Sequence, residues 1–138
     1  MRVVRYLLDT SALLCLRDDE PGAGRVAAII QQSAAGVAQG YGCFMTLMEI
    51  YYRVWKDEGR DRGRQAYDGA RRLPVAWIHE SPGLLQRAVA LKATRQLSLA
   101  DAWIAAAAQE AGAILVHKDP DFQGVRGLKQ EVLPLRRA

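Results

Sequence analysis

Several residue types that would define a site are scarce in this 138-residue sequence. It has two cysteines and two histidines, and no spacing among them is typical of a zinc site. Cys15 and Cys43 lie in apolar surroundings, so we expect two buried thiols in a reducing compartment. No apolar run approaches the roughly 18 residues of a membrane span, and the run over residues 3–8 is too short for a signal peptide. The sequence therefore predicts a soluble, cytoplasmic protein.

The composition excludes a disordered chain, because half of the residues are hydrophobic. The length suits a single domain over residues 1–138, large enough to bury about two-thirds of the surface of its unfolded chain. The net charge is +4, and 15 arginines outnumber four lysines. This modest excess permits an anionic partner without establishing one. Arginine favours bidentate phosphate contacts, so nucleic acid is one candidate.

Short apolar runs alternate along the chain with segments of helical spacing. The runs predict strands over residues 3–8, 43–45, 74–79 and 113–116, with a final edge strand over 132–135. Spacing, capping residues and turn residues predict helices over residues 10–16, 23–39, 46–72 as a helical hairpin, 81–96 and 97–110. This alternation predicts an α/β three-layer sandwich with a central, mostly parallel sheet flanked by helices.

Most of the fifteen acids occupy charged loops or helical faces, but a few are flanked by apolar residues. Asp9 directly follows the first apolar run, and Asp119 follows the run at residues 113–116. Sites in a parallel sheet collect at the carboxyl ends of the strands, so we expect both acids at one edge. Glu49 and Asp101 fall in the first turns of predicted helices that can reach this edge, and Asp121 lies beside Asp119.

Each of these acids also has a purely structural explanation. Asp9 and Asp119 could cap a helix or begin a turn. Glu49 and Asp101 could stabilise the first turn of a helix. Four converging carboxylates would repel one another unless cations compensate them, and Lys118 is the only basic residue adjacent in sequence. Mg²⁺ or Mn²⁺ takes oxygen ligands and can activate water for phosphodiester cleavage, so the set favours a divalent-cation site.

Four motifs in this order resemble the PIN-domain family, and most closely its VapC toxins from bacterial toxin–antitoxin pairs. They are LDTS at residues 8–11, TLME at 46–49, LADAWIAA at 99–106 and HKDPDF at 117–122. The resemblance spans nearly the whole chain and implies a metal-dependent endoribonuclease. It maps Asp9, Glu49, Asp101 and Asp119 onto the family's catalytic, metal-binding quartet, with Asp121 as an additional metal ligand.

The resemblance implies further roles and partners. Mg²⁺, or alternatively Mn²⁺, would be the cofactor, RNA the substrate, a cognate antitoxin the inhibitor, and a homodimer the assembly. Thr10 and Ser11 would lie behind the metal ligands or face the phosphate. His117 stands where the family often has serine or threonine. It could bond a water on the metal or a phosphate, or it could mark altered catalysis.

Residues 53–72 carry seven basic and four acidic side chains. This segment is either a solvated helical hairpin or a face that tracks RNA phosphates, for which Arg60, Arg62 and Arg64 are the candidates. The aromatic side chains at residues 51, 52 and 55, around the start of this segment, could line an antitoxin groove or belong to an ordinary core face.

Other function classes fit less well. A haloacid-dehalogenase-like phosphatase needs an acid two residues after the first, and Ser11 stands there. A receiver-like signalling domain would place an acidic pair near Asp9, but residues 7–10 hold one acid. A metal- or nucleic-acid-binding domain with weakened catalysis is the remaining alternative.

Overall fold

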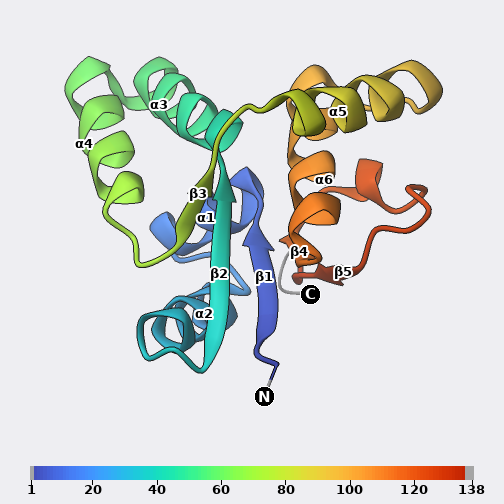
Figure 1. Ribbon diagram of the computed structural model, residues 1–138. Coiled ribbons are helices and arrows are strands. Elements are labelled where there is room, and N and C mark those ends of the chain that lie inside the picture. The colour runs from blue at the N-terminus through green and yellow to red at the C-terminus, as the bar shows by residue number, and fades with distance from the viewer. Residues whose placement is uncertain (1, 136–138) are drawn as a thin grey trace.

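A five-stranded sheet forms the centre of the computed structural model, which describes residues 2–135 (Figure 1). Its strands are β1 (Val4–Leu8), β2 (Ala38–Cys43), β3 (Ala76–Ile78), β4 (Ile114–His117) and β5 (Gln130–Val132). They lie in the order β3-β2-β1-β4-β5, and every neighbouring pair is parallel. The first strand of the chain is therefore the middle strand of the sheet.

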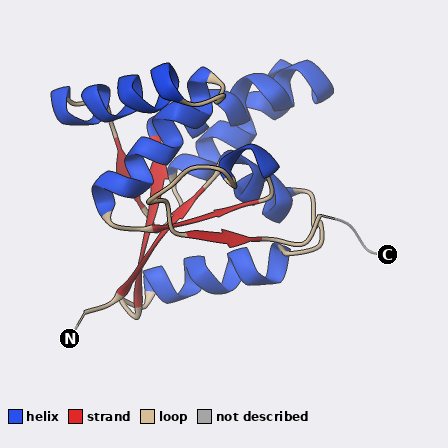
Figure 2. Ribbon diagram, turned by 90° about the vertical axis from the view of Figure 1, so that its right-hand side faces the viewer, coloured by secondary structure: helices blue, strands red, loops and turns tan. Residues whose placement is uncertain are grey.

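Helices cover both faces of this sheet, which confirms the predicted three-layer α/β sandwich (Figure 2). They are α1 (Thr10–Arg17), α2 (Ala23–Ala34), α3 (Phe44–Glu58), α4 (Arg60–Arg71), α5 (Pro82–Thr94) and α6 (Leu99–Ala111), with a short 3₁₀ helix η1 (Pro120–Phe122). Within the described residues, no helix combines the length and apolar character that crossing a membrane requires.

Side-chain alternation along β1 builds the two cores. Leu7 packs with side chains of α5 and α6, whereas Tyr6 and Leu8 pack with those of α1 and α2. Leu7 and Leu8 are both fully buried. Successive residues of a strand point to opposite faces, so a continuous apolar run is what a central parallel strand requires.

The prediction for residues 23–45 was wrong in its boundaries. The helix expected to reach residue 39 ends at Ala34, because Gly36 takes a left-handed φ of 75° and the Val37 N–H bonds the Gln32 carbonyl at 2.9 Å. The chain then enters β2, five residues before the predicted strand. Backbone pairing with β1 on one side and β3 on the other defines β2, which has no apolar pattern of its own.

The predicted capping box at Thr46 was also wrong. Helix α3 begins at Phe44, and Cys43 precedes it without a side-chain capping bond. Thr46 therefore lies inside the first turn, where its hydroxyl is free to bond Thr10 at 2.9 Å. The edge strand β5 occupies residues 130–132 rather than the predicted 132–135.

Helices α3 and α4 lie side by side as the predicted hairpin (Figure 1). Gly63 of α4 lies directly against α3. A Cβ atom at this position would lie 2.9 Å from the Tyr51 carbonyl oxygen and 3.0 Å from the Trp55 backbone nitrogen. Only glycine permits this approach of two backbones, so Gly63 helps to fix how α4 packs on α3.

We expect Gly63→Ala to lower the free energy of unfolding by roughly 1–3 kcal/mol, because the added methyl group meets backbone atoms that cannot yield. Gly69→Ala in the same helix is the control, since its Cβ would meet nothing within 4 Å. That variant should gain about 0.5–1 kcal/mol from the higher helix propensity of alanine. Urea unfolding of both proteins measures the difference, and equal stabilities would contradict the close approach.

Candidate metal centre

Strand ends place two of the predicted acids at one edge of the sheet. Asp9 follows the last residue of β1, and its N–H bonds the Val116 carbonyl of β4 at 3.0 Å. Asp119 lies two residues beyond the end of β4. Because β1 and β4 are parallel neighbours, their carboxyl ends meet, as the sequence led us to expect.

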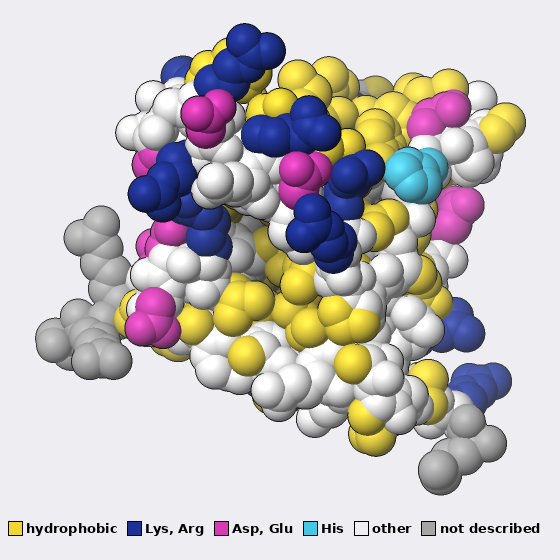
Figure 3. All heavy atoms as spheres, turned by 90° about the vertical axis from the view of Figure 1, so that its left-hand side faces the viewer, with side chains coloured by type: hydrophobic (Ala, Val, Ile, Leu, Met, Phe, Trp, Pro, Cys, Tyr) yellow, Lys and Arg dark blue, Asp and Glu magenta, His cyan; other side chains and the backbone are white. Residues whose placement is uncertain are grey.

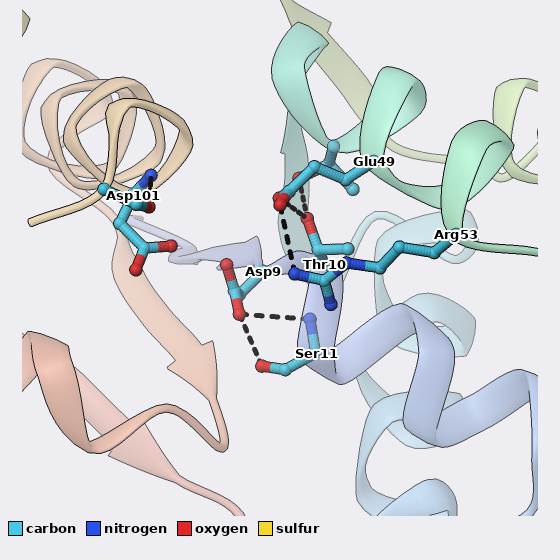
Figure 4. Close-up of polar contacts among 8 residues, drawn as sticks. Asp9, Thr10, Ser11, Glu49, Arg53 and Asp101 are labelled. Atoms are coloured by element: carbon cyan, nitrogen blue, oxygen red, sulfur yellow. Dashed lines mark hydrogen bonds and ion pairs between the residues drawn. The ribbon is translucent and has the colours of Figure 1, made fainter. Parts of the chain in front are cut away.

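Helices α3 and α6 bring the other two acids to the same edge. The Phe44 and Trp103 rings pack edge to face with their centroids 5.1 Å apart, which joins the first turns of these helices. Glu49 projects from α3 and Asp101 from α6. In Figure 4 the carboxylate of Asp9 lies between those of Asp101 and Glu49.

Three carboxylates have the spacing of cation ligands. Asp101, Asp119 and Asp121 each offer one oxygen atom, and these atoms lie within 4.8 Å of one another. Oxygen ligands about 2.1–2.5 Å from one hard cation would have separations in this range. Within residues 2–135 this is the one group of three or more acidic, histidine or cysteine side chains so arranged. Asp9 and Glu49 lie beside the group without belonging to it.

Asp9 is both a helix cap and a member of this edge. Its side chain is almost fully buried, and its Oδ2 atom accepts bonds from the backbone N–H of Ser11, at 3.0 Å, and from the Ser11 hydroxyl. The Ser11 hydroxyl in turn accepts the Lys118 backbone N–H at 3.0 Å. Since both bonds go to Oδ2, Oδ1 is the oxygen that remains for a cation.

Glu49 is held by a chain of polar side chains. Its Oε1 atom accepts the Thr10 hydroxyl at 2.7 Å, and the Thr10 oxygen lies 2.9 Å from the Thr46 oxygen. A hydroxyl carries one proton, so Thr46 donates to Thr10 and Thr10 donates to Glu49. The second oxygen, Oε2, pairs with Nη2 of Arg53 at 3.2 Å. Thr10 thus lies behind Glu49, and its predicted role behind a metal ligand stays a prediction.

Burial and mutual repulsion make full ionisation of these acids unfavourable without a cation. Desolvation raises the pKa of Asp9, and the Glu49 carboxylate raises it further, while the bonds from Ser11 oppose the shift. Desolvation, followed by the charges of Asp119 and Asp9, raises the pKa of Asp101 to about 8. A bound divalent cation would reverse both effects, because it stabilises the ionised form.

His117 is placed differently from the expectation that it contacts a metal water or a phosphate. It is completely buried, and its Nδ1 atom accepts the Asp119 N–H at 2.9 Å. Its Nε2 atom lies 2.8 Å from Oε1 of Gln130 and therefore donates to it. Both ring nitrogens are thus engaged within the protein, and the ring holds the turn that presents Asp119.

The three candidate arginines lie on α4, which packs beside α3, the helix that carries Glu49. All are exposed, and Figure 3 shows basic side chains gathered on the upper part of this face, where α4 lies. Arg64 pairs with Asp68 at 3.1 Å, and the Arg60 guanidinium lies 5.4 Å from the Trp55 ring centroid. Arg62 forms neither kind of contact among the described residues.

The aromatic side chains of α3 differ among themselves. Tyr51 is half-buried and stacks on Tyr67 with their ring centroids 5.0 Å apart. Tyr52 and Trp55 are exposed, so neither belongs to an ordinary core face. Arg53 was counted with the basic segment of residues 53–72, but its pairing with Glu49 was not predicted, although a glutamate and an arginine four residues apart on a helix are a recognised pairing signal.

We expect the stability of the metal-free protein to fall as the pH rises from 5 to 8. The folded-state pKa of Asp101, about 8, exceeds its ordinary 3.8, so the folded state retains a proton that the unfolded state has released. Relative to the wild type, Asp101→Asn should have a free energy of unfolding that is roughly 1–2 kcal/mol higher at pH 8 than at pH 5. The difference is small because water screens this partly exposed group. Urea unfolding in EDTA measures it, with exposed Asp57→Asn as the control. An unchanged pH dependence in Asp101→Asn would contradict the prediction.

Comparison with known proteins gives the family of this fold. The PIN domain model matches residues 6–128. A chain of VapBC2 from Rickettsia felis, solved with a fragment of promoter DNA, aligns with TM-score 0.75 and 16% identity over 95% of this chain and 100% of that chain. Mycobacterium tuberculosis VapC20, a sarcin–ricin loop cleaving toxin, aligns with TM-score 0.69 and 19% identity over 94% and 99%.

A chain of a toxin–antitoxin complex from Klebsiella pneumoniae shows 27% identity, with TM-score 0.61 over 89% of this chain and 94% of that chain. No curated protein matches significantly. The PIN domain model nevertheless extends from β1 to just before β5 and so includes every acid of the edge. The chain belongs to the PIN-domain family.

Proposed function

We propose that this protein is a Mg²⁺- or Mn²⁺-dependent endoribonuclease that acts as the toxin of a toxin–antitoxin pair. The observation that carries the proposal is the group of Asp101, Asp119 and Asp121, whose oxygens lie within 4.8 Å of one another at the carboxyl edge of the sheet. Asp9 lies next to Asp101 (Figure 4). None of these four acids forms an ion pair with a basic side chain of residues 2–135, so a bound cation would compensate their charge in the ionised form.

The donor set fits a hard divalent cation, because all its members are carboxylates. A bound Mg²⁺ or Mn²⁺ would lower the pKa of a water and stabilise the charge that develops on a phosphodiester. Asp101, Asp119 and Asp121 would hold the ion together with Oδ1 of Asp9. Glu49 would contact the ion or accept a proton from the attacking water, and its bond from Thr10 fixes it for either role.

The supporting residues keep these acids in place before any ligand arrives. The Ser11 hydroxyl bonds Asp9 and also accepts the Lys118 N–H just after β4. The His117 ring accepts the N–H of Asp119. Pre-formed geometry lowers the reorganisation that binding would otherwise require. His117 in this sequence therefore serves to position an acid and does not by itself argue for weakened catalysis.

The proposed partners follow from the family and its similar structures. One similar fold belongs to a toxin that cleaves the sarcin–ricin loop, and others come from toxin–antitoxin complexes. By analogy we propose RNA as the substrate, a cognate antitoxin as the inhibitor, a homodimer as the assembly and the cytoplasm as the location.

The sheet disfavours the receiver-like alternative. A receiver domain has the strand order 2-1-3-4-5, whereas the order here is 3-2-1-4-5. A binding domain with weakened catalysis would keep the same fold and the same acids, so an RNA cleavage assay distinguishes it from the nuclease.

We expect Asp9→Asn to reduce RNA cleavage by a factor of roughly 100 or more, because it removes a charged ligand from the reacting centre. The fold should persist, since an asparagine can also cap α1. The assay is cleavage of total RNA in Mn²⁺ with EDTA as the metal-free control. Asp57→Asn, an exposed acid of α3, should cleave like the wild type. Cleavage by the wild type in excess EDTA, or by Asp9→Asn at the normal rate, would refute the metal mechanism.

We expect the α4 arginines to contribute to RNA binding by pairing with phosphates. Replacing Arg60, Arg62 and Arg64 with alanine should lower the slope of log Kd against log salt by about 0.7 for each phosphate that is no longer neutralised. Filter binding to a single-stranded RNA in EDTA measures the slope. A matched triple variant at the exposed residues Arg87, Arg95 and Arg126 should keep the wild-type slope. Equal slopes in all three proteins would make α4 an ordinary solvated face.

A further inference from the structure

Arg53 is the one basic side chain of residues 2–135 that forms an ion pair with any of the five acids at the candidate metal centre. We propose that Arg53 binds a backbone phosphate of the RNA and positions it over these acids. This inference rests on the proposed ribonuclease function and deepens it, because it assigns a substrate contact to a residue outside the acidic set.

The two ends of the Glu49–Arg53 pair differ in exposure. The Glu49 side chain is 10% exposed and that of Arg53 is 45% exposed. Figure 4 shows Arg53 reaching from α3 toward the space between Glu49 and Ser11, beside Asp9. The guanidinium therefore touches the buried acid on its inner side and meets solvent on its outer side, where a phosphate would approach.

Glu49 does not depend on Arg53 for its position. The Thr10 hydroxyl already binds Glu49 Oε1 at 2.7 Å, and Thr46 supports Thr10. The contact between Nη2 of Arg53 and Oε2 of Glu49 is longer, at 3.2 Å. A guanidinium has five N–H donors, so four remain after this bond, enough for a bidentate contact with phosphate oxygens.

The other basic residue near this edge is unsuitable. Lys118 uses its backbone N–H to bind Ser11, and its ammonium group pairs with Glu20 at 3.3 Å. Its side chain is only 9% exposed. Arg53 is thus the side chain that can meet an incoming phosphate, and its position one helical turn after Glu49 places that phosphate beside the acids.

A contact between Arg53 and a phosphate would reduce the electrostatic repulsion between the acids and RNA. Five carboxylates at one edge repel a polyanion, and a divalent cation offsets only part of this charge. A fixed guanidinium at the margin supplies local attraction and, through its planar geometry, an orientation for the phosphate. If Arg53 were only a counter-ion for Glu49, removing it would change stability and leave RNA binding as it was.

The test is fluorescence anisotropy of a labelled single-stranded RNA in EDTA, across a salt series, so that no bound cation contributes. We expect Arg53→Gln to raise Kd about 5- to 10-fold and to lower the salt slope by about 0.7, the value for a single neutralised phosphate. Arg53→Lys should keep the slope and lose part of the affinity, because lysine retains the charge without the bidentate geometry.

Arg87→Gln is the matched control, because Arg87 is 47% exposed and pairs with Glu110 at 3.6 Å, on helices that carry none of the phosphate-binding candidates. It should leave both Kd and slope unchanged. Urea unfolding of Arg53→Gln separates a binding defect from a folding defect. Wild-type Kd and slope in a folded Arg53→Gln protein would overturn the inference.

The outcomes separate this inference from the proposed function. If the wild type cleaves RNA in Mn²⁺ but Arg53→Gln binds RNA as tightly as the wild type, only the role of Arg53 fails. Cleavage without measurable binding in EDTA would also refute that role, because the proposed contact needs no cation. If the wild type neither binds nor cleaves RNA, both proposals fail.

Discussion

Electrostatic repulsion among carboxylates that are partly removed from water is the constraint on which this structure depends. Burial is the main cause that raises the pKa of Asp9, and neighbouring charges add to burial in raising that of Asp101. The surrounding polar groups offset part of the free-energy cost of keeping these carboxylates ionised. Ser11 bonds Asp9, Thr10 bonds Glu49, and Arg53 pairs with Glu49. The remaining charge is what a divalent cation would compensate.

The parallel sheet explains why these acids meet at all. β1 lies in the middle of the sheet, so its carboxyl end is surrounded by neighbouring strands and by the helices that follow them. Asp9 follows β1 and Asp119 follows β4, which are paired along their lengths. The contact between Phe44 and Trp103 then brings the starts of α3 and α6 together over the same edge. Strand pairing and the packing of these partly buried rings thus help to determine where the charged groups lie.

The sequence could place Asp9 and Asp119 at the carboxyl ends of neighbouring strands because the signals for those strand ends are local. An apolar run that stops at an acid is visible without any tertiary information. The helices predicted over residues 81–96 and 97–110 likewise form as α5 (Pro82–Thr94) and α6 (Leu99–Ala111). β2 was misplaced because its strand character comes from pairing with β1 and β3, which no local pattern records. The role of buried His117 depends on Gln130, a partner thirteen residues away. The role of Thr46 depends on the exact start of α3 and on Thr10, which is distant in sequence.

The acids divide into two sets with different surroundings, and we propose that the two sets contribute to different steps. Asp101, Asp119 and Asp121 have ligand spacing and no basic partner among the described residues, so in the proposed mechanism they would hold the cation. Glu49 is already bonded by Thr10 and paired with Arg53, so its oxygens are less available to an ion and better placed to act on a water or to hold a guanidinium near the substrate. Cation affinity should therefore depend mainly on the first set and substrate orientation mainly on the second. In Figure 4 the carboxylate of Asp9 lies between those of Asp101 and Glu49, one acid from each set, so Asp9 is placed to contact either a cation or the substrate.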